Sequence, residues 1–234
     1  MTTIKKQLDN ASDILANHSL SPRLDAEVLL AFVLGKNRSY LRAWDDKQLE
    51  VKSLELFVEL VEKRSVGVPV AYLTGQREFW SRDFKVSPAV LIPRPETELL
   101  IELCLESLSS RQKYAVLDLG TGSGAIAVTL AAERPLVEIL SNPPYIAQDD
   151  VHLSQGDVRF EPMSALVAED KGLGDIKRIA NDAKKHLRPG GQLWFEHGYN
   201  QARETQEILK ELNYKDVKTY FDLSGQPRVT MGFI

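Results

Sequence analysis

The stretch VLDLGTGSGAIAVTLA, residues 116–131, decides the fold of this chain. Its first apolar residues lead to Asp118, glycines follow at positions 120, 122 and 124, and a helix-forming run begins at Ala125. Because glycine has no side chain, the backbone of such a turn can approach a ligand closely. The pattern is typical of a nucleotide-binding turn between a strand and a helix, although alone it is also compatible with a turn that binds nothing.

The residues around this turn predict an α/β domain. A helix is expected from Glu96 to Leu108, and from the turn to the C-terminus strands and helices alternate, as in a mainly parallel sheet. The glycine spacing is G-x-G-x-G after an acidic residue, not the G-x-G-x-x-G of dinucleotide enzymes, which favours S-adenosylmethionine over a nicotinamide cofactor. The candidate cofactor-binding residues are Asp118, Gly120, Thr121, Gly122, Ser123 and Gly124.

The segment Asn142-Pro143-Pro144-Tyr145 is the second chemical signal. It follows the apolar residues 137–140, and therefore stands at the carboxyl end of an expected strand, where open α/β sheets bind ligands. The prolines stiffen the segment and leave carbonyl groups free as acceptors, although they are also compatible with a simple turn. Asn142 and Pro143 can accept the two N–H groups of a planar –NH₂ group while Tyr145 stacks on its flat face. We expect Asn142, Pro143 and Tyr145 to be catalytic, all four residues to bind substrate, and Asn142 also to contact the cofactor.

The N-terminal third predicts a small helical bundle. Ser21 and Pro22 are typical of a helix start, and the apolar pattern that follows ends at Gly35. Further apolar stripes at helical spacing are formed by Ile4, Leu8, Ala11 and Leu15, and by Leu54, Phe57, Val58 and Val61.

A β-rich linker is expected between the bundle and the α/β domain. Phe84, Val86, Val90 and Ile92 alternate around Ser87-Pro88, as in a β-hairpin. The predicted organisation is a helical domain over 1–72, a hairpin linker over 73–98 and an α/β domain over 99–234.

Composition excludes several classes of function. The net charge of −4 and the pI near 5.7 provide no overall basic field for nucleic acid. One cysteine, Cys104, cannot form an internal disulfide, and the four histidines lack the spacing of a zinc site, so no metal is expected. The longest apolar run, residues 28–34, is too short for a bilayer core of about 30 Å, and no signal peptide is recognised. We expect a cytoplasmic protein that binds no membrane.

These motifs together resemble the glutamine N5-methyltransferases of class I release factors. The resemblance lies in PVAYLTGQREFW, LIPRPETE, DLGTGSG, NPPYI, RFEP, LWFEHG and the terminal RVTMG. It implies a Rossmann-like methyltransferase domain behind the helical domain, with S-adenosylmethionine as methyl donor and class I release factors as partners. Residues 120–124 would cradle the methionine and ribose part of the donor, residues 142–145 would receive the glutamine, and the helical domain with the hairpin would help to dock the release factor.

One departure from that family concerns the region between the two motifs. Family members have further strand–helix units there, whereas this chain has only residues 125–141, and a unit takes about 30 residues or more. The missing part would include the acidic residue that binds the ribose hydroxyls and a strand that helps to hold the adenine. We expect that residues are omitted from the printed sequence near 140–141, because a true deletion would remove the cofactor pocket alone. Leu140 and Ser141 are then predicted to occupy different sheet positions.

Three alternatives remain at this stage. A glutamine methyltransferase for a ribosomal protein shares both motifs, but PRPETE resembles the release-factor branch. A DNA adenine-N6 methyltransferase also binds a flat –NH₂ group. Such an enzyme must also bind DNA phosphates, which the net negative charge of this chain disfavours. If the deletion is real, the chain could instead bind release factors with impaired catalysis.

Overall fold

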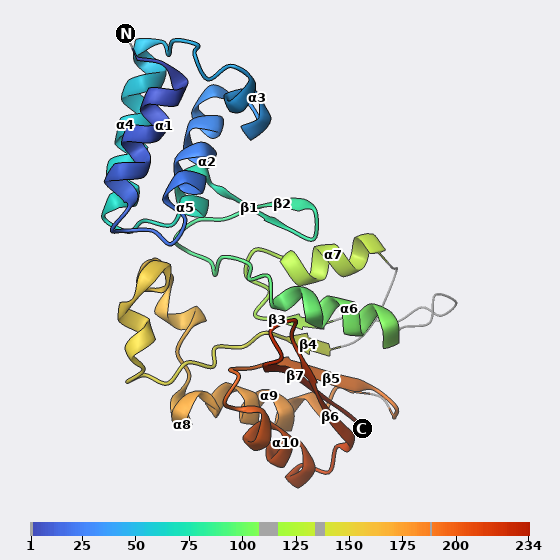
Figure 1. The fold of residues 1–234 in the computed structure, drawn as a ribbon. Helices are drawn as coiled ribbons and strands as arrows, with labels where there is room; N and C mark the ends of the chain where they lie inside the picture. Colours follow the sequence, from blue (N-terminus) through green and yellow to red (C-terminus); the bar gives the residue numbers. More distant parts are fainter. Residues whose placement is uncertain (1, 108–116, 134–138, 188) are drawn as a thin grey trace. The chain divides into compact units, whose positions relative to one another are not determined.

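The computed structural model describes residues 2–107, 117–133, 139–187 and 189–234. The chain divides into two compact units (Figure 1). The helical unit contains Met1–Gln76 together with Ser154–Phe160, and the α/β unit contains Arg77–Leu153 and Glu161–Ile234. None of the helices in these ranges is both long and apolar enough to cross a membrane.

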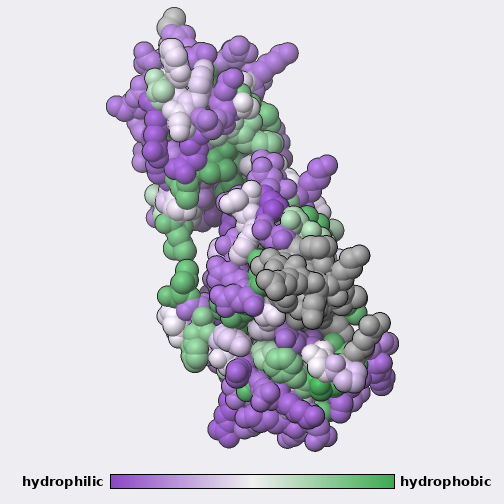
Figure 2. All heavy atoms as spheres, turned by 90° about the vertical axis from the view of Figure 1, so that its right-hand side faces the viewer, coloured by the Kyte–Doolittle hydropathy of each residue, from purple (hydrophilic) through white to green (hydrophobic). Residues whose placement is uncertain are grey.

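The helical unit consists of helices whose apolar stripes face one core. The predicted stripe of α1 is buried completely, from Ile4 to Leu15. Helix α2 follows Ser21, has Pro22 in its first turn and ends at Gly35, whose φ of 59° suits glycine. The face of this unit drawn in Figure 2 is mixed, with apolar areas among the hydrophilic ones, and Val58 of the predicted α4 stripe is exposed. The helices are α1 (Ile4–Leu15), α2 (Pro22–Leu34), α3 (Arg38–Ala43), α4 (Val51–Ser65) and α5 (Val70–Thr74).

A segment distant in sequence completes the helical unit. The 3₁₀ helix η2 (Gly156–Phe160) returns to the end of α4, where Arg64 binds both Asp25, at 2.7 Å, and Asp157, at 2.8 Å. Arg64 is buried, so these carboxylates offset the cost of burying its charge. Arg159 adds a hydrogen bond to the Val66 carbonyl oxygen at 2.8 Å. The sequence did not indicate that this segment belongs with the N-terminal helices.

The β-hairpin is present, but its turn lies earlier than predicted. Strands β1 (Gln76–Phe79) and β2 (Arg82–Lys85) are joined by Trp80 and Ser81, whose φ angles of 54° and 56° are those of a type I′ turn. The prediction that Ser87-Pro88 forms the hairpin turn is therefore wrong, although a turn closed by the Val90 amide and the Ser87 carbonyl is present there. Residues 86–96 form no strand, since three of them are prolines, which cannot donate to a β-ladder.

The α/β unit contains a five-stranded sheet in the order β3-β4-β5-β7-β6. Strands β3, β4 and β5 are parallel, and β7 is antiparallel to both β5 and β6. The strands are β3 (Leu117–Leu119), β4 (Ile139–Ser141), β5 (Gln192–Glu196), β6 (Lys215–Phe221) and β7 (Pro227–Phe233).

Helices cover both faces of this sheet (Figure 1). Trp194 of β5 packs with α6 (Thr97–Ser107) and α7 (Ala125–Glu133), whereas its neighbours Leu193 and Phe195 pack with α9 (Gly174–Ala183) and α10 (Ala202–Glu211). Successive side chains of a strand point to opposite faces, which explains why β5 contributes to both clusters. The short helices η1 (Val151–Ser154), η3 (Met163–Ala165) and α8 (Glu169–Gly172) lie in the connection before α9. The predicted α/β class is confirmed.

Strand β4 is continuous across the predicted break. Leu140 pairs with Asp118 and Trp194, and Ser141 pairs with Leu119 and Phe195. The prediction that Leu140 and Ser141 occupy different sheet positions is wrong, because both pair in one unbroken register on both sides. Parts of three predicted segments lie outside the described ranges: Leu108 at the end of the predicted helix, Val116 before the glycine turn and Val137 before the NPPY segment. Among the described strands, β3 forms one edge of the sheet.

Replacing Arg64 by methionine should destabilise the helical unit by about 3 kcal/mol, because Asp25 would remain buried without its cation. Hydrogen exchange of the α4 backbone amides measures this local loss directly. The matched control is Lys63→Met, which removes only the exposed pair with Glu59 and should change stability by less than about 1 kcal/mol. Equal protection of α4 in the two variants would contradict this role of Arg64.

Candidate functional site

The candidate site is formed where three parallel strands end. Leu119, Ser141 and Phe195 lie side by side as the last paired positions of β3, β4 and β5 in this register. The Ser141 hydroxyl donates to the Leu119 carbonyl oxygen at 3.2 Å and ties the ends of β3 and β4 together. The glycine turn, Asn142 and Glu196 follow these positions directly. The sheet therefore brings the two sequence motifs to one edge, as expected for the carboxyl ends of parallel strands.

The glycine turn leaves its backbone accessible. Gly120, Gly122 and Gly124 have φ angles of 75°, 54° and 79°, and a Cβ atom built on Gly120 would meet nothing within 4 Å. Just before the turn, the Asp118 carboxylate has no well-aligned hydrogen-bond partner among the described residues. Burial raises the pKa of Asp118, while weaker interactions with Thr121 and the Ala127 backbone oppose the shift. The carboxylate is suited to a donor or cation supplied by a ligand.

Asn142 is oriented by Thr97, the first residue of α6. Its Nδ2 group donates to the Thr97 hydroxyl oxygen at 3.2 Å, and Thr97 is buried. Among the described residues, no donor reaches Asn142 Oδ1 or the Pro143 carbonyl oxygen. The two acceptors proposed from the sequence are thus not engaged by any described residue, with Asn142 partly exposed and Pro143 buried.

The remainder of the segment is fixed from both ends. The Tyr145 hydroxyl donates to Glu196 Oε1 at 3.3 Å, and Gln201 Nε2 donates to the Tyr145 carbonyl oxygen at 2.8 Å. Gly172 packs so closely that a Cβ atom there would lie 2.1 Å from this carbonyl oxygen. Directly after Tyr145, Ile146 forms an isolated parallel β-bridge with Val167, which fixes the C-terminal end of the segment.

Glu196 is a buried carboxyl directly behind Tyr145. It is only 1% exposed, and its Oε2 atom has no aligned hydrogen-bond partner among the residues described. Burial raises the pKa of Glu196 to about 7, against opposing contributions from the Thr97 hydroxyl and the Arg228 charge. A buried carboxyl that titrates near neutral pH is more typical of a functional site than of a simple core position.

Comparison with known proteins identifies the family. The release factor glutamine methyltransferase of Vibrio cholerae is 43% identical, and the alignment covers 98% of this chain and 96% of the relative. The release factor glutamine methyltransferase of Escherichia coli is 40% identical, and the alignment covers 92% of this chain and 93% of the relative. The chain belongs to the release factor glutamine methyltransferase family. Residues 6–75 also match the PrmC N-terminal domain. A release-factor-specific protein-(glutamine-N5) methyltransferase of known structure from Alicyclobacillus acidocaldarius is 29% identical, over 64% of this chain and 98% of its own, with a TM-score of 0.42.

This member of the methyltransferase family is internally shorter than its relative. The alignment with the Vibrio cholerae protein runs over 276 positions, whereas this chain has 234 residues, so more than 40 aligned positions face no residue here. Among the described strands, β3 is an edge strand, and no strand–helix unit is described on its outer side.

Two residues that shape the candidate site were not predicted from the sequence. Thr97 orients Asn142, and Glu196 holds Tyr145, although neither belongs to the glycine turn or to the NPPY segment. A signal was present for Glu196, since a carboxylate directly follows the apolar run Leu193–Phe195 at the end of a strand. For Thr97 the only signal was its position in the PETE segment just before a helix.

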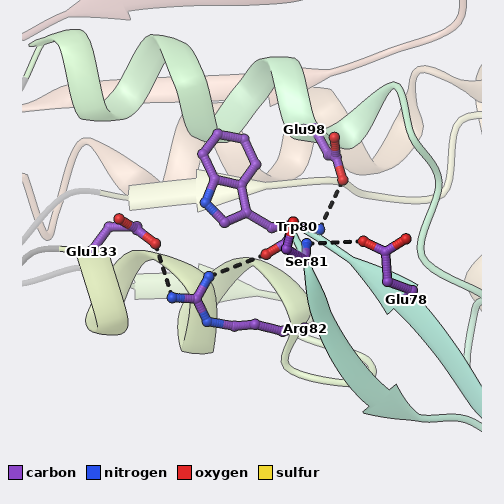
Figure 3. Close-up of a pocket in the computed structure, with 6 residues that line it drawn as sticks. All are labelled: Glu78, Trp80, Ser81, Arg82, Glu98 and Glu133. Carbon is purple, nitrogen blue, oxygen red and sulfur yellow. Dashed lines mark hydrogen bonds and ion pairs between the residues drawn. The ribbon is translucent and has the colours of Figure 1, made fainter.

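A separate hollow of about 630 Å³ lies beside the hairpin turn (Figure 3). Its charged groups are already engaged: the Trp80 amide donates to Glu98 at 2.8 Å, and Arg82 donates to Glu133 at 2.9 Å. No lining residue comes from the glycine turn or the NPPY segment. We assign the hollow a structural role, because Glu98 follows Thr97 and links the hairpin to the start of α6.

Glu196 makes the stability of the enzyme depend on pH. Because its pKa is raised to about 7, the folded protein retains a proton that the unfolded chain releases near pH 4.5. This stabilisation is complete below pH 4.5 and is lost as the pH rises through about 7. The free energy of unfolding of the wild type, relative to Glu196→Gln, should fall by about 3 kcal/mol across this window. Urea denaturation of both proteins at each pH measures the difference, and a difference independent of pH would contradict the raised pKa.

Proposed function

We propose that this chain transfers a methyl group from S-adenosylmethionine to the side-chain amide nitrogen of a glutamine in a peptide chain release factor. The observation that carries the proposal is the meeting of the glycine turn and Asn142 at one edge of the sheet, with two acceptors that no described residue engages. The names of the curated relatives support the same reaction and substrate.

The residues of the glycine turn fit the amino-acid half of the methyl donor. An open backbone at Gly120 allows close approach, and the Asp118 carboxylate is suited to the ammonium group of a methionine. The bound donor supplies an electrophilic methyl group. We assign its binding to Asp118, Gly120, Thr121, Gly122, Ser123 and Gly124, with a contribution from Asn142. No described residue is assigned to the ribose or the adenine, because no described strand lies on the outer side of β3 to supply one.

The acceptor residues address the low reactivity of an amide nitrogen, whose lone pair is delocalised into the carbonyl group. Asn142 Oδ1 and the Pro143 carbonyl would accept its two N–H groups and hold the nitrogen in line for transfer, while Tyr145 packs against the flat face. Pro144 keeps the segment stiff. These contacts act through orientation and electrostatic stabilisation of the transition state, so no covalent intermediate is required.

The helical unit is proposed to dock the release factor. Support comes from the match of residues 6–75 to the PrmC N-terminal domain, which covers most of the proposed docking domain over 1–72. We further propose that the hairpin linker over 73–98 assists docking and that the domain over 99–234 carries the chemistry. Since release factors act on cytosolic ribosomes, the proposed location is the cytoplasm.

The proposal is tested by offering the chain and S-adenosylmethionine three acceptors: a class I release factor, ribosomal proteins and an adenine-containing DNA duplex. Mass spectrometry should find one methyl group on a glutamine of the release factor alone. Methylation of a ribosomal protein or of adenine would replace the proposed substrate. Tight binding of the release factor without methyl transfer would favour a second candidate function, that of a binding module. The short α/β sheet is the observation that favours this alternative.

Asn142→Ala should reduce glutamine methylation on the order of a hundredfold or more, because one acceptor of the reacting amide is lost. Affinity for the methyl donor should remain largely unchanged. The control is Asn181→Ala, which removes an exposed asparagine side chain on α9. Turnover by the Asn142 variant at the wild-type rate would remove Asn142 from the assigned role.

Gly122→Val should prevent binding of the methyl donor, since a β-branched residue is strained at a φ of 54° and its side chain would occupy the ligand side of the turn. Gly35→Val is the control, because Gly35 has a comparable φ of 59° at the end of α2 in the helical unit. Equilibrium dialysis with labelled donor compares the two variants. Equal donor affinity in both would mean that the glycine turn is only structural.

A further inference from the structure

Glu196 contacts the site from behind and has no part in the mechanism described so far. It ends β5, one residue after the position where Phe195 pairs with Ser141, just as Asn142 follows Ser141. The side chain is 1% exposed and accepts a hydrogen bond from the Tyr145 hydroxyl. Its Oε2 atom has no aligned partner among the described residues. A buried carboxyl with an open acceptor position requires a reason, because its burial is costly.

Thr97 connects this carboxyl to Asn142. The Thr97 hydroxyl oxygen accepts the hydrogen bond from Asn142 Nδ2 at 3.2 Å, and the same hydroxyl interacts with Glu196. A hydroxyl has one hydrogen to donate, and an ionised carboxylate can only accept. An ionised Glu196 attracts the Thr97 hydrogen, and the Thr97 oxygen then receives the hydrogen bond from Asn142. The Asn142 amide is then fixed with Nδ2 toward Thr97 and Oδ1 free.

We propose that Glu196, as a carboxylate, is a positioning residue that acts through Thr97 to present Asn142 Oδ1 to the substrate amide. This inference rests on the proposed function, because it concerns the same glutamine site. When Glu196 is protonated, it can donate to Thr97, and the Thr97 hydrogen can turn to Asn142 Oδ1. The reversed Asn142 amide would then present its –NH₂ group to the –NH₂ group of the substrate, and two donors do not bind each other.

The surroundings of Glu196 place this change near neutral pH. Burial raises the pKa of Glu196 to about 7, the Thr97 hydroxyl and Arg228 of β7 oppose the rise, and Glu96, just before α6, adds to it. On the remaining side, the Tyr145 hydroxyl donates to the carboxylate. The enzyme should therefore be switched on as the pH rises through about 7, when Asn142 takes the productive orientation.

The kinetic test uses the full chain with a release factor and S-adenosylmethionine. Wild-type kcat should rise with pH around 7, whereas Glu196→Gln should lose roughly tenfold or more in kcat and show no such rise, with KM for the donor unchanged. Thr97→Val should match Glu196→Gln, and Thr97→Ser, which keeps the hydroxyl, should retain activity. The double variant Glu196→Gln with Thr97→Val should be no worse than either single variant. An unchanged pH profile in Glu196→Gln would overturn the inference.

A second measurement is independent of turnover. In wild-type protein labelled with ¹³C and ¹⁵N, the Glu196 carboxyl should titrate near pH 7, and the Asn142 side-chain amide resonances should shift over the same range. Thr97→Val should abolish the Asn142 shift while Glu196 still titrates. Titration of Glu196 without any response from Asn142 would overturn the inference even in an active enzyme. Wild-type protein that methylates no glutamine would instead refute the proposed function.

Discussion

The parallel pairing of β4 with both β3 and β5 is the constraint on which the site depends. Only this register makes Leu119, Ser141 and Phe195 neighbours, so that the glycine turn, Asn142 and Glu196 leave the sheet together. Helices on both faces bury the strands and fix their order. A one-residue slip of β4 would turn each of its side chains to the opposite face and separate Asn142 from Thr97. The chemistry is therefore a consequence of sheet register more than of any single motif.

Local patterns in the sequence were sufficient for the elements but not for their long-range contacts. The stripe from Ile4 to Leu15 and the glycine turn were predictable, because spacing and φ preferences act over a few residues. The hairpin turn was misplaced, since Trp80 and Ser81 adopt a left-handed conformation usually taken by glycine or asparagine. The return of residues 154–160 to Arg64, and the link from Glu196 to Tyr145, depend on tertiary packing that no local pattern encodes.

The shortened α/β unit separates two halves of the methyl-donor site. The proposed half for the amino-acid part and the substrate amide has its residues together, from Asp118 through Asn142 to Glu196. No described strand lies beyond β3 to supply the other half. Transfer by this chain would then depend mainly on the contacts of the glycine turn and on orientation of the substrate, because these are the contacts that the sheet retains.

The most direct test is a crystal structure of the full chain with S-adenosylhomocysteine and a glutamine-containing release-factor peptide. The account predicts the homocysteine part of the ligand on the glycine turn beside Asp118. The glutamine amide nitrogen should lie within hydrogen-bond distance of both Asn142 Oδ1 and the Pro143 carbonyl oxygen, with Asn142 Nδ2 still on Thr97. A ligand bound away from the turn, or a glutamine amide that contacts neither acceptor, would contradict the claim that the ends of β3, β4 and β5 form one methyl-transfer site.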